Sequence, residues 1–360
     1  MTDMLPRSVL VVDDSAFMRK LIAEMIAEHP GFRVIGVARD GVDAVAQLHR
    51  LAPDIVTLDL EMPKLDGLDV LQRIMTESPR PVVVLSAGGP QYGDATLRAL
   101  ELGAVDFVRK PSGPVSLDLP IIRDRLVAAL EAAARATLAP PPSTPARLAQ
   151  ERATDRSVLH RAAQHVVVIA SSTGGPRALA EIVPRLPASL NAAVVVAQHL
   201  PGEFTPALAA RLSRASEMDV CEAEDGMRLS AGNVYIARGG VNTSITGIAG
   251  SAQLSEQVPS PRFGATPNAD VLFQSAAQVF ASECTGVILT GMGRDGSIGL
   301  RQIRTAGGRA IVQDETSSAI YGMPRAALAE AGADEVVSLS MMANAIIGMV
   351  PKERLEWLTA

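Results

Sequence analysis

Aromatic residues are scarce in this sequence: Phe, Trp and Tyr together make up 3% of its 360 residues. We therefore expect hydrophobic cores built mainly from Val, Ile, Leu and Ala. Cysteine is also scarce, because Cys221 and Cys284 are the only two and they form no CxxC spacing. This argues against a disulfide framework or a cysteine-rich metal site and favours two buried, reduced thiols.

Long hydrophobic runs and an excess of positive charge are missing as well. No stretch reaches the roughly 18 apolar residues of a membrane span. The N-terminal sequence MTDMLPRSVLVVDDS meets acidic residues directly after a short apolar run, unlike a signal peptide. The formal net charge of -6 argues against non-specific binding of nucleic acid or anionic membranes. We expect a cytoplasmic protein without membrane insertion and without a nucleic-acid partner.

What is present is a globular composition, with 48% hydrophobic and 20% charged residues. From Ser8 to about Arg135, short apolar strands alternate with amphipathic stretches, which is typical of a parallel, doubly wound α/β sheet with helices on both faces. We assign residues 1–135 to this first domain. Its candidate strands are SVLVVDD, RVIGVA, IVTLDL, PVVVLSA and VDFVRKP.

Residues 136–160 are rich in Pro, Ala, Ser and charge, and this composition predicts a semi-extended linker. Residues 161–360 again alternate β-branched strands with helical patterns, so we predict a second doubly wound, largely parallel α/β domain. Its candidate strands are HVVVIAS, AAVVVAQH, NVYIAR, GVILTG and RAIVQDE.

Acidic residues follow the strands of the first domain at the edge where ligands gather in such sheets. Asp13 and Asp14 end the first strand, Asp59 ends the third, and Lys110 ends the fifth. Crowded carboxylates repel one another unless a cation offsets their charge, and a hard cation with oxygen ligands such as Mg²⁺ does so. A carboxylate in this setting can also act as a nucleophile toward phosphorus.

This constellation resembles the response-regulator receiver family over roughly residues 8–130, which implies a flavodoxin-like (βα)5 fold. The resemblance implies that Asp59 accepts a phosphoryl group from a histidine kinase. It implies Mg²⁺ held by Asp13, Asp14, Asp59 and the backbone carbonyl of Glu61. It also implies a phosphate-sensing set, which consists of Ser86, Phe107 and Lys110.

The second domain has a serine at its first strand-to-helix turn, where Ser172 follows VVVIAS and precedes Thr173-Gly174-Gly175-Pro176. A serine on such a turn can present its hydroxyl above the sheet edge, and the glycines let a substrate approach the backbone. The helix N-terminus favours negative charge that develops there. The same pattern is also typical of an ordinary helix N-cap with proline in the first turn.

Two further groups close strands at the same predicted edge. His199 follows AAVVVAQ and would be a natural general base near a serine, although a structural histidine also fits. Asp295 follows GVILTGMGR and could orient the imidazole, which would complete a Ser-His-Asp triad from three strand ends.

The segment that contains Asp295 supports a rival interpretation. Gly291, Gly293 and Gly296 spell GxGxxG, and Asp314 lies about 18 residues beyond, near the spacing of a ribose-binding acid in a dinucleotide site. That fingerprint normally follows the first strand of its domain, however, and this interpretation leaves Ser172 and His199 without a role.

The second half resembles the catalytic domain of the chemotaxis protein-glutamate methylesterases, the CheB family, in the order receiver, linker, esterase. By position, the resemblance implies Ser172 as nucleophile, His199 as base and Asp295 as orienting carboxylate, with backbone N–H groups of Thr173 and Met292 as oxyanion donors. The motifs that carry it are SSTGGP at 171–176, QHLP at 198–201, NVYIA at 233–237, LTGMGRDG at 289–296 and QDETSSAIYGMP at 313–324.

The chain departs from the family pattern at Ala170-Ser171, where Gly-Ala is usual, and at Arg262 to Asp270. The resemblance implies a phosphorylation-activated serine carboxylic-ester hydrolase that needs no cofactor for the ester chemistry. Its expected partners are methylated chemoreceptors and a chemotaxis histidine kinase, and deamidation of receptor glutamines is an expected side activity. We expect the unphosphorylated receiver to cover the Ser172 site. The alternative from another class is a non-catalytic docking module under receiver control.

Overall fold

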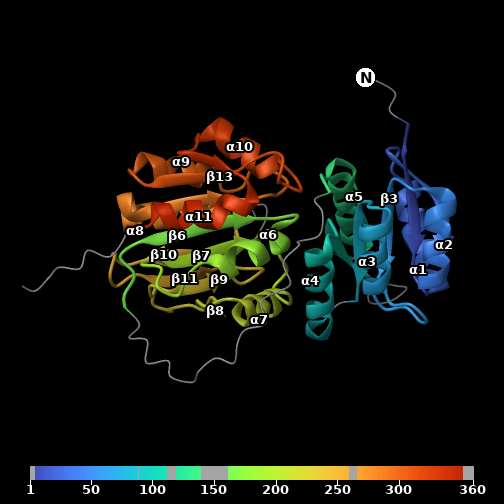
Figure 1. Ribbon diagram of the computed structural model, residues 1–360, viewed down its shortest axis with the longest axis horizontal. Helices are drawn as coiled ribbons and strands as arrows, with labels where there is room; N and C mark the ends of the chain where they lie inside the picture. The colour runs from blue at the N-terminus through green and yellow to red at the C-terminus, as the bar shows by residue number, and fades with distance from the viewer. Residues whose placement is uncertain (1–4, 88, 112–118, 139–160, 259–265, 352–360) are drawn as a thin grey trace, which may run out of the picture. The chain divides into compact units, whose positions relative to one another are not determined.

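The computed structural model describes residues 5–87, 89–111, 119–138, 161–258 and 266–351. The chain divides into two compact units, Met1–Ser143 and Thr144–Ala360, coloured blue to green and green to red in Figure 1. Most of the predicted linker, residues 139–160, lies outside the described residues, as do residues 262–265 of the departing segment. Among the described residues, none of the helices combines the length and the hydrophobicity of a membrane span.

The N-terminal unit contains a five-stranded parallel sheet in the order β2-β1-β3-β4-β5, which is the flavodoxin-like order. All five predicted strands are present. The strands are β1 (Arg7–Val12), β2 (Phe32–Ala38), β3 (Ile55–Asp59), β4 (Val82–Ser86) and β5 (Asp106–Arg109). The helices are α1 (Ala16–Ala27), α2 (Gly41–Leu51), α3 (Gly67–Glu77), α4 (Gly93–Leu102) and α5 (Leu119–Arg135).

Local sequence explains where the first helices of this unit begin. Ser15, Asp40 and Asp66 are N-caps whose side chains accept a backbone N–H in the first turn of α1, α2 and α3. Helix α5 packs against α1, while α3 contacts both α2 and α4, so helices cover both faces of the sheet. β3 and β4 are buried along their whole length, as expected for central parallel strands.

The C-terminal unit contains a seven-stranded parallel sheet in the order β14-β13-β12-β6-β7-β9-β8 and a separate antiparallel pair, β10-β11. The strands are β6 (Val166–Ser171), β7 (Ala193–Gln198), β8 (Asp219–Glu222), β9 (Asn233–Ile236), β10 (Asn242–Thr246), β11 (Gln253–Gln257), β12 (Cys284–Ile288), β13 (Arg309–Gln313) and β14 (Glu335–Val337). The helices are α6 (Gly175–Ile182), α7 (Thr205–Ala215), α8 (Ala269–Phe280), α9 (Ser297–Thr305), α10 (Gly322–Glu330) and α11 (Leu339–Met349).

The predicted doubly wound, largely parallel architecture is confirmed in both units, but the sequence did not predict β8, β10, β11 and β14. The order of the large sheet reverses at β6, where the chain first runs outward through β7 and later returns through β12 on the other side. Figure 1 shows β6 and β7 side by side. A strand-order reversal of this kind leaves a crevice at the carboxyl ends of the strands, where ligands bind in open α/β sheets.

The core of the C-terminal unit is built from small aliphatic side chains, as predicted. Phe204 and Phe273 are its largest fully buried side chains. Helix α8 packs closely on α9 and on β10, and Gly299 allows this approach, because a Cβ there would lie 2.5 Å from Cβ of Phe273. Cys284 is completely buried, as predicted, whereas Cys221 is half-buried.

A buried histidine gives this unit a pH dependence. His165 lies at the amino end of the sheet, with Nε2 3.0 Å from Oγ1 of Thr285 and Nδ1 3.4 Å from Oε2 of Glu283. Burial lowers the pKa of His165 below its usual 6.5, and Glu283 only partly opposes this. Because the unfolded chain then binds the proton more tightly, stability is lost as the pH falls through 6.5.

We predict that the free energy of unfolding of this unit decreases as the pH is lowered from 7 to 5. His165 contributes at most about 1.4 kcal/mol per pH unit to this decrease. His165→Gln should flatten that slope in calorimetry. His49→Gln, which changes a histidine of the N-terminal unit, is the matched control. An unchanged slope in His165→Gln would contradict the assignment.

Candidate functional site

Three carboxylates meet at the carboxyl edge of the N-terminal sheet, as predicted. Asp13 directly follows β1 and Asp59 is the last residue of β3, so both side chains project from strand ends. Each of Asp13, Asp14 and Asp59 offers an oxygen, and these oxygens all lie within 4.8 Å of one another. Asp13 and Asp59 are buried while Asp14 is exposed.

One ammonium group pairs with the two buried acids. Nζ of Lys110 lies 2.8 Å from Oδ2 of Asp13 and 2.6 Å from Oδ2 of Asp59. Burial would lower the pKa of Lys110, but its pairing with both acids outweighs burial and raises it. Burial also raises the pKa of Asp59 to about 6, with Lys110 acting in the opposite direction.

Three carboxylates facing one ammonium leave an excess of negative charge, and their hard oxygen donors suit a divalent cation. Glu61 is next to this cluster, because its backbone N–H donates to Oδ1 of Asp59 at 3.1 Å. The residues present therefore fit a cation of the magnesium type.

Of the three predicted phosphate-sensing residues, only Lys110 pairs with Asp59 within the described part of the chain. Lys110 contacts Asp59 directly, whereas the hydroxyl of Ser86 lies 2.7 Å from that of Thr96 on α4. No hydrogen bond joins Ser86 to Asp59 within the described part of the chain. Phe107 is buried in β5 with 3% of its surface exposed.

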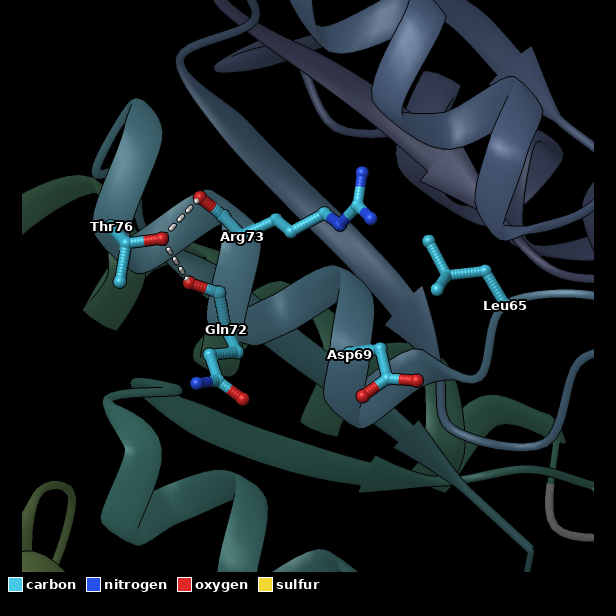
Figure 2. Close-up of a pocket in the computed structure, with 5 residues that line it drawn as sticks. All are labelled: Leu65, Asp69, Gln72, Arg73 and Thr76. Atoms are coloured by element: carbon cyan, nitrogen blue, oxygen red, sulfur yellow. Dashed lines mark hydrogen bonds between the residues drawn. The ribbon is translucent and has the colours of Figure 1, made fainter.

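A shallow hollow of about 400 Å³ lies on the outer face of α3, and Figure 2 shows it with its lining residues. The Thr76 hydroxyl in it donates to the carbonyl oxygens of Gln72 and Arg73, so this polar group is satisfied within its own helix. None of the predicted site residues lines the hollow. The lining residues are Leu65, Asp69, Gln72, Arg73 and Thr76.

In the C-terminal unit, strand register brings the predicted serine and histidine to neighbouring positions. Ser171 pairs with Gln198 in the parallel ladder of β6 and β7, so Ser172 and His199 are each the next residue after that pair. The chain turns sharply after Ser172, because Gly174 adopts a positive φ of 79° and Gly175 starts α6. Both the serine and the histidine are half-buried at the sheet edge.

The imidazole and the predicted orienting carboxylate are in direct contact. Nε2 of His199 lies 2.8 Å from Oδ2 of Asp295, and 13% of each side chain is exposed. The carboxylate is further fixed by three backbone N–H donors. These are Ala269 at 2.7 Å to Oδ2, and Asp270 at 3.1 Å and Gly296 at 3.0 Å to Oδ1.

This contact decides which imidazole nitrogen can act as a base. A carboxylate that accepts from Nε2–H keeps the proton on that nitrogen and leaves Nδ1 as the acceptor. Within the described residues, neither Nδ1 of His199 nor the hydroxyl of Ser172 makes a hydrogen bond. The approach of this hydroxyl to the imidazole stays a prediction.

The loop after β12 lies directly against the serine. A Cβ on Gly291 would lie 2.8 Å from Cβ of Ser172 and 3.1 Å from its nitrogen, so only glycine fits. The next residue, Met292, has a backbone N–H that donates to no atom of the described residues. Thr173 is tied to the same loop, because its carbonyl accepts the Thr290 hydroxyl at 3.0 Å.

Two features of this site were not predicted from the sequence. The first is the start of α8, whose first backbone N–H groups donate to Asp295. The second is Gln198, whose side-chain amide donates to the carbonyl oxygens of Ser172 and His199. The available signal was a glutamine at the end of an otherwise apolar strand, directly before the histidine.

The rival dinucleotide site is not supported by the geometry. Asp314 would have to bind a ribose, but its carboxylate accepts Ser317 N–H at 3.0 Å, Ser317 O–H at 2.6 Å and Thr316 O–H at 3.0 Å. Its oxygens are therefore committed to its own turn. Gly291, the first glycine of the fingerprint, packs on Ser172.

Two known families match the chain, one in each of the two units. Residues 9–121 match the response regulator receiver domain. Residues 167–346 match the CheB methylesterase family. Both resemblances expected from the sequence motifs are confirmed.

Two similar curated proteins are each named protein-glutamate methylesterase/protein-glutamine glutaminase. One, from Symbiobacterium thermophilum, is 44% identical, and the alignment covers 95% of this chain and 96% of that protein. Another, from Bacillus subtilis, is 41% identical, with 96% and 99% covered. Among solved structures, the CheB methylesterase catalytic domain of Thermotoga maritima is 38% identical, with a TM-score of 0.50 over 52% of this chain and 98% of that chain.

Proposed function

The chain belongs to the CheB methylesterase family, and from this premise we propose that Ser172, His199 and Asp295 form its catalytic triad. The protein is a phosphorylation-activated protein-glutamate methylesterase and protein-glutamine glutaminase. The observation that carries the triad is the 2.8 Å contact between His199 and Asp295, next to the strand end that bears Ser172.

Each residue has a defined task in the proposed reaction. Nδ1 of His199 takes the proton of the Ser172 hydroxyl as its oxygen attacks the γ-carbonyl carbon of a glutamate methyl ester. The imidazolium, stabilised by Asp295, gives that proton to the leaving methoxide, and methanol departs. Water, activated by the same imidazole, then cleaves the acyl-serine and releases the glutamate.

Backbone donors stabilise the oxyanion that forms at the carbonyl oxygen. The N–H of Met292 is free of other partners within the described residues and lies on the loop that packs on Ser172. Thr173, the residue after the serine, supplies the second donor at the start of α6, where the helix dipole also favours negative charge.

The proposed substrates are methylated chemoreceptors, whose γ-glutamyl methyl esters present the carbonyl that this site attacks. The site also accepts a γ-carboxamide, since ammonia can leave as methanol does, and this accounts for the glutaminase activity in the names of the relatives. We place this reaction in the cytoplasm, where a chemotaxis histidine kinase is the phosphoryl donor of Asp59.

Mass spectrometry of methylated receptor membranes tests this function. Incubation with the full chain should remove the methyl group from receptor glutamates and convert selected glutamines to glutamates. The docking alternative instead predicts binding with the methylation pattern unchanged. Receptor glutamates that keep every methyl group would contradict the proposed function.

We propose that Mg²⁺ is the cation of the acidic cluster, held by Asp13, Asp14, Asp59 and the carbonyl of Glu61. When bound, it offsets charge on the phosphoryl oxygens as Asp59 is phosphorylated. Lys110, already paired with Asp59, contributes a second positive charge at the same place. One carboxylate oxygen of Asp59 attacks phosphorus, and the P–N bond to the kinase histidine breaks as the new O–P bond forms.

Addition of Mg²⁺ is expected to stabilise the N-terminal unit, because it relieves the repulsion among the three carboxylates. At a free Mg²⁺ concentration one hundred times Kd, the free energy of unfolding should increase by about 2.7 kcal/mol. This stabilisation is detected as an increase in the Tm of the unit. Asp14→Asn removes only the exposed carboxylate and should weaken the response. If Mg²⁺ raises the Tm of Asp14→Asn as much as that of the wild type, the assigned ligand set is contradicted.

Asp59→Asn is expected to abolish activation while leaving basal hydrolysis. A small phosphodonor should accelerate the wild type by about 5- to 150-fold, the range of a coupling of 1–3 kcal/mol. The variant should show no acceleration, because it lacks the phosphoryl acceptor. Acceleration of Asp59→Asn to the wild-type rate would show that another group is phosphorylated.

A further inference from the structure

Two buried polar residues lie directly beneath the proposed catalytic serine and histidine. Ser171 is the last residue of β6 and Gln198 the last of β7, and they oppose each other in the ladder. Their exposed fractions are 0% and 1%. Buried polar groups at such a position need partners, and a fully satisfied network makes its surroundings rigid.

The side-chain amide of Gln198 is fully committed. Its oxygen accepts the Ser171 hydroxyl at 2.6 Å, and its nitrogen donates to the carbonyl oxygens of Ser172 at 3.0 Å and His199 at 3.2 Å. One side chain therefore joins the main chains of the residues proposed as nucleophile and base. The Ser171 hydroxyl fixes which way the amide faces.

We infer that Gln198 and Ser171 are positioning residues, which hold Ser172 and His199 at a fixed separation for the transfer of the hydroxyl proton. This inference rests on the proposed function of that site. The last main-chain bond between the two strands runs from His199 N–H to the Ser171 carbonyl at 3.0 Å. The Gln198 amide extends this tie past the end of the ladder, to the two residues that carry the chemistry.

The start of α6 is shaped around the same amide. A Cβ on Gly175 would lie 2.0 Å from Oε1 of Gln198 and 2.8 Å from Cβ of Ser171. The absence of a side chain at Gly175 thus leaves room for this hydrogen-bonded pair. The Ser171 hydroxyl anchors the other side of this amide, because it donates to Oε1 of Gln198 at 2.6 Å.

The expected effect follows from geometry. Loss of the tie changes the relative placement of Ser172 and His199 but removes no contact with substrate. We therefore expect Gln198→Met, similar in shape but without donors, to lower kcat by about 10- to 100-fold with KM unchanged. Ser171→Ala leaves the two carbonyl contacts in place and should lower kcat by about tenfold, the low end of that range.

The double variant Ser171→Ala/Gln198→Met separates positioning from stability. Each single substitution leaves a buried polar atom without its partner, whereas the double removes both members of that bond. The decrease in Tm of the double variant should therefore be smaller than the sum of the decreases in the two single variants. Its kcat should be no higher than that of Gln198→Met. A kcat that recovers together with Tm would overturn the inference and indicate a structural role.

Thr285→Val is the matched control. It also removes a buried hydroxyl, the partner of His165, but at the opposite edge of the sheet, so kcat should stay at the wild-type value. A wild-type chain that hydrolyses no ester would contradict the proposed function. An active wild type with unchanged kcat in Gln198→Met would overturn only the positioning role. If Gln198→Met does not fold, a wild-type kcat in Ser171→Ala overturns it.

Discussion

Ser172→Ala is expected to lower the rate of glutamyl ester hydrolysis by about 10⁴- to 10⁶-fold, because no other group replaces the attacking oxygen. What remains is attack by water, assisted by the oxyanion donors and by substrate binding. KM should change little, since one hydroxyl contributes little to ground-state binding. Steady-state kinetics on a glutamyl methyl ester peptide measure both constants.

Ser318→Ala is the control for this substitution, since it removes a buried hydroxyl that donates only to the Asp314 carbonyl in the same unit. It should retain wild-type kcat. The fold of Ser172→Ala should also survive, because its hydroxyl makes no hydrogen bond to any described residue. Equal Tm values for this variant and the wild type would check that. Retention of more than a hundredth of the wild-type kcat in Ser172→Ala would contradict the nucleophile assignment.

Asp295→Asn is expected to lower kcat by about 10³- to 10⁴-fold, as loss of the orienting carboxylate does in such triads. The four donors that surround Asp295 explain why an amide fits badly. His199 and Ala269 N–H point at one oxygen, and Asp270 and Gly296 N–H at the other. An –NH₂ group at either place meets donors, so a donor is left unpaired and the imidazole loses its fixed tautomer.

The same substitution should lower stability by about 1–3 kcal/mol, the cost of a buried donor without an acceptor. Asp334→Asn is the matched control, because Asp334 also accepts a backbone N–H, from Ala310 at 2.8 Å, but at the amino edge of the sheet. It should lose stability without loss of kcat. If Asp295→Asn and Asp334→Asn have the same kcat, Asp295 does not orient the base.

The sequence predicted the sheets well because parallel strands carry two strong signals. A strand that is buried on both faces reads as a short β-branched run, as in VVVIAS and AAVVVAQ, and it ends where polar residues begin. Since all carboxyl ends of a parallel sheet lie at one edge, His199 and Asp295 could be expected to meet although they are 96 residues apart.

The missed strands lack these signals. β8 and β14 lie at the edges of the large sheet, and each is only three or four residues long with charged residues included. The β10-β11 pair is polar on much of its surface, and its pairing depends on packing against α8 rather than on its own pattern. Short edge strands of this kind are defined by their neighbours.

The supporting contacts of the site also lay beyond the sequence pattern. No local sequence pattern predicts that the first turn of α8 donates to Asp295. That contact spans about 25 residues and depends on how α8 packs on α9. The hydroxyl of Ser171 appeared only as a departure from a family pattern. Its partner, the Gln198 amide, becomes evident only when the register of β6 and β7 is known.

Methanol release from methylated receptor membranes is the most direct test of the central claim, that a hydroxyl, an imidazole and a carboxylate at one sheet edge hydrolyse a glutamate methyl ester. In the presence of Mg²⁺, the full chain should release methanol, faster with a small phosphodonor, and Ser172→Ala should release none above the blank. Release by Ser172→Ala at the wild-type rate would contradict the account.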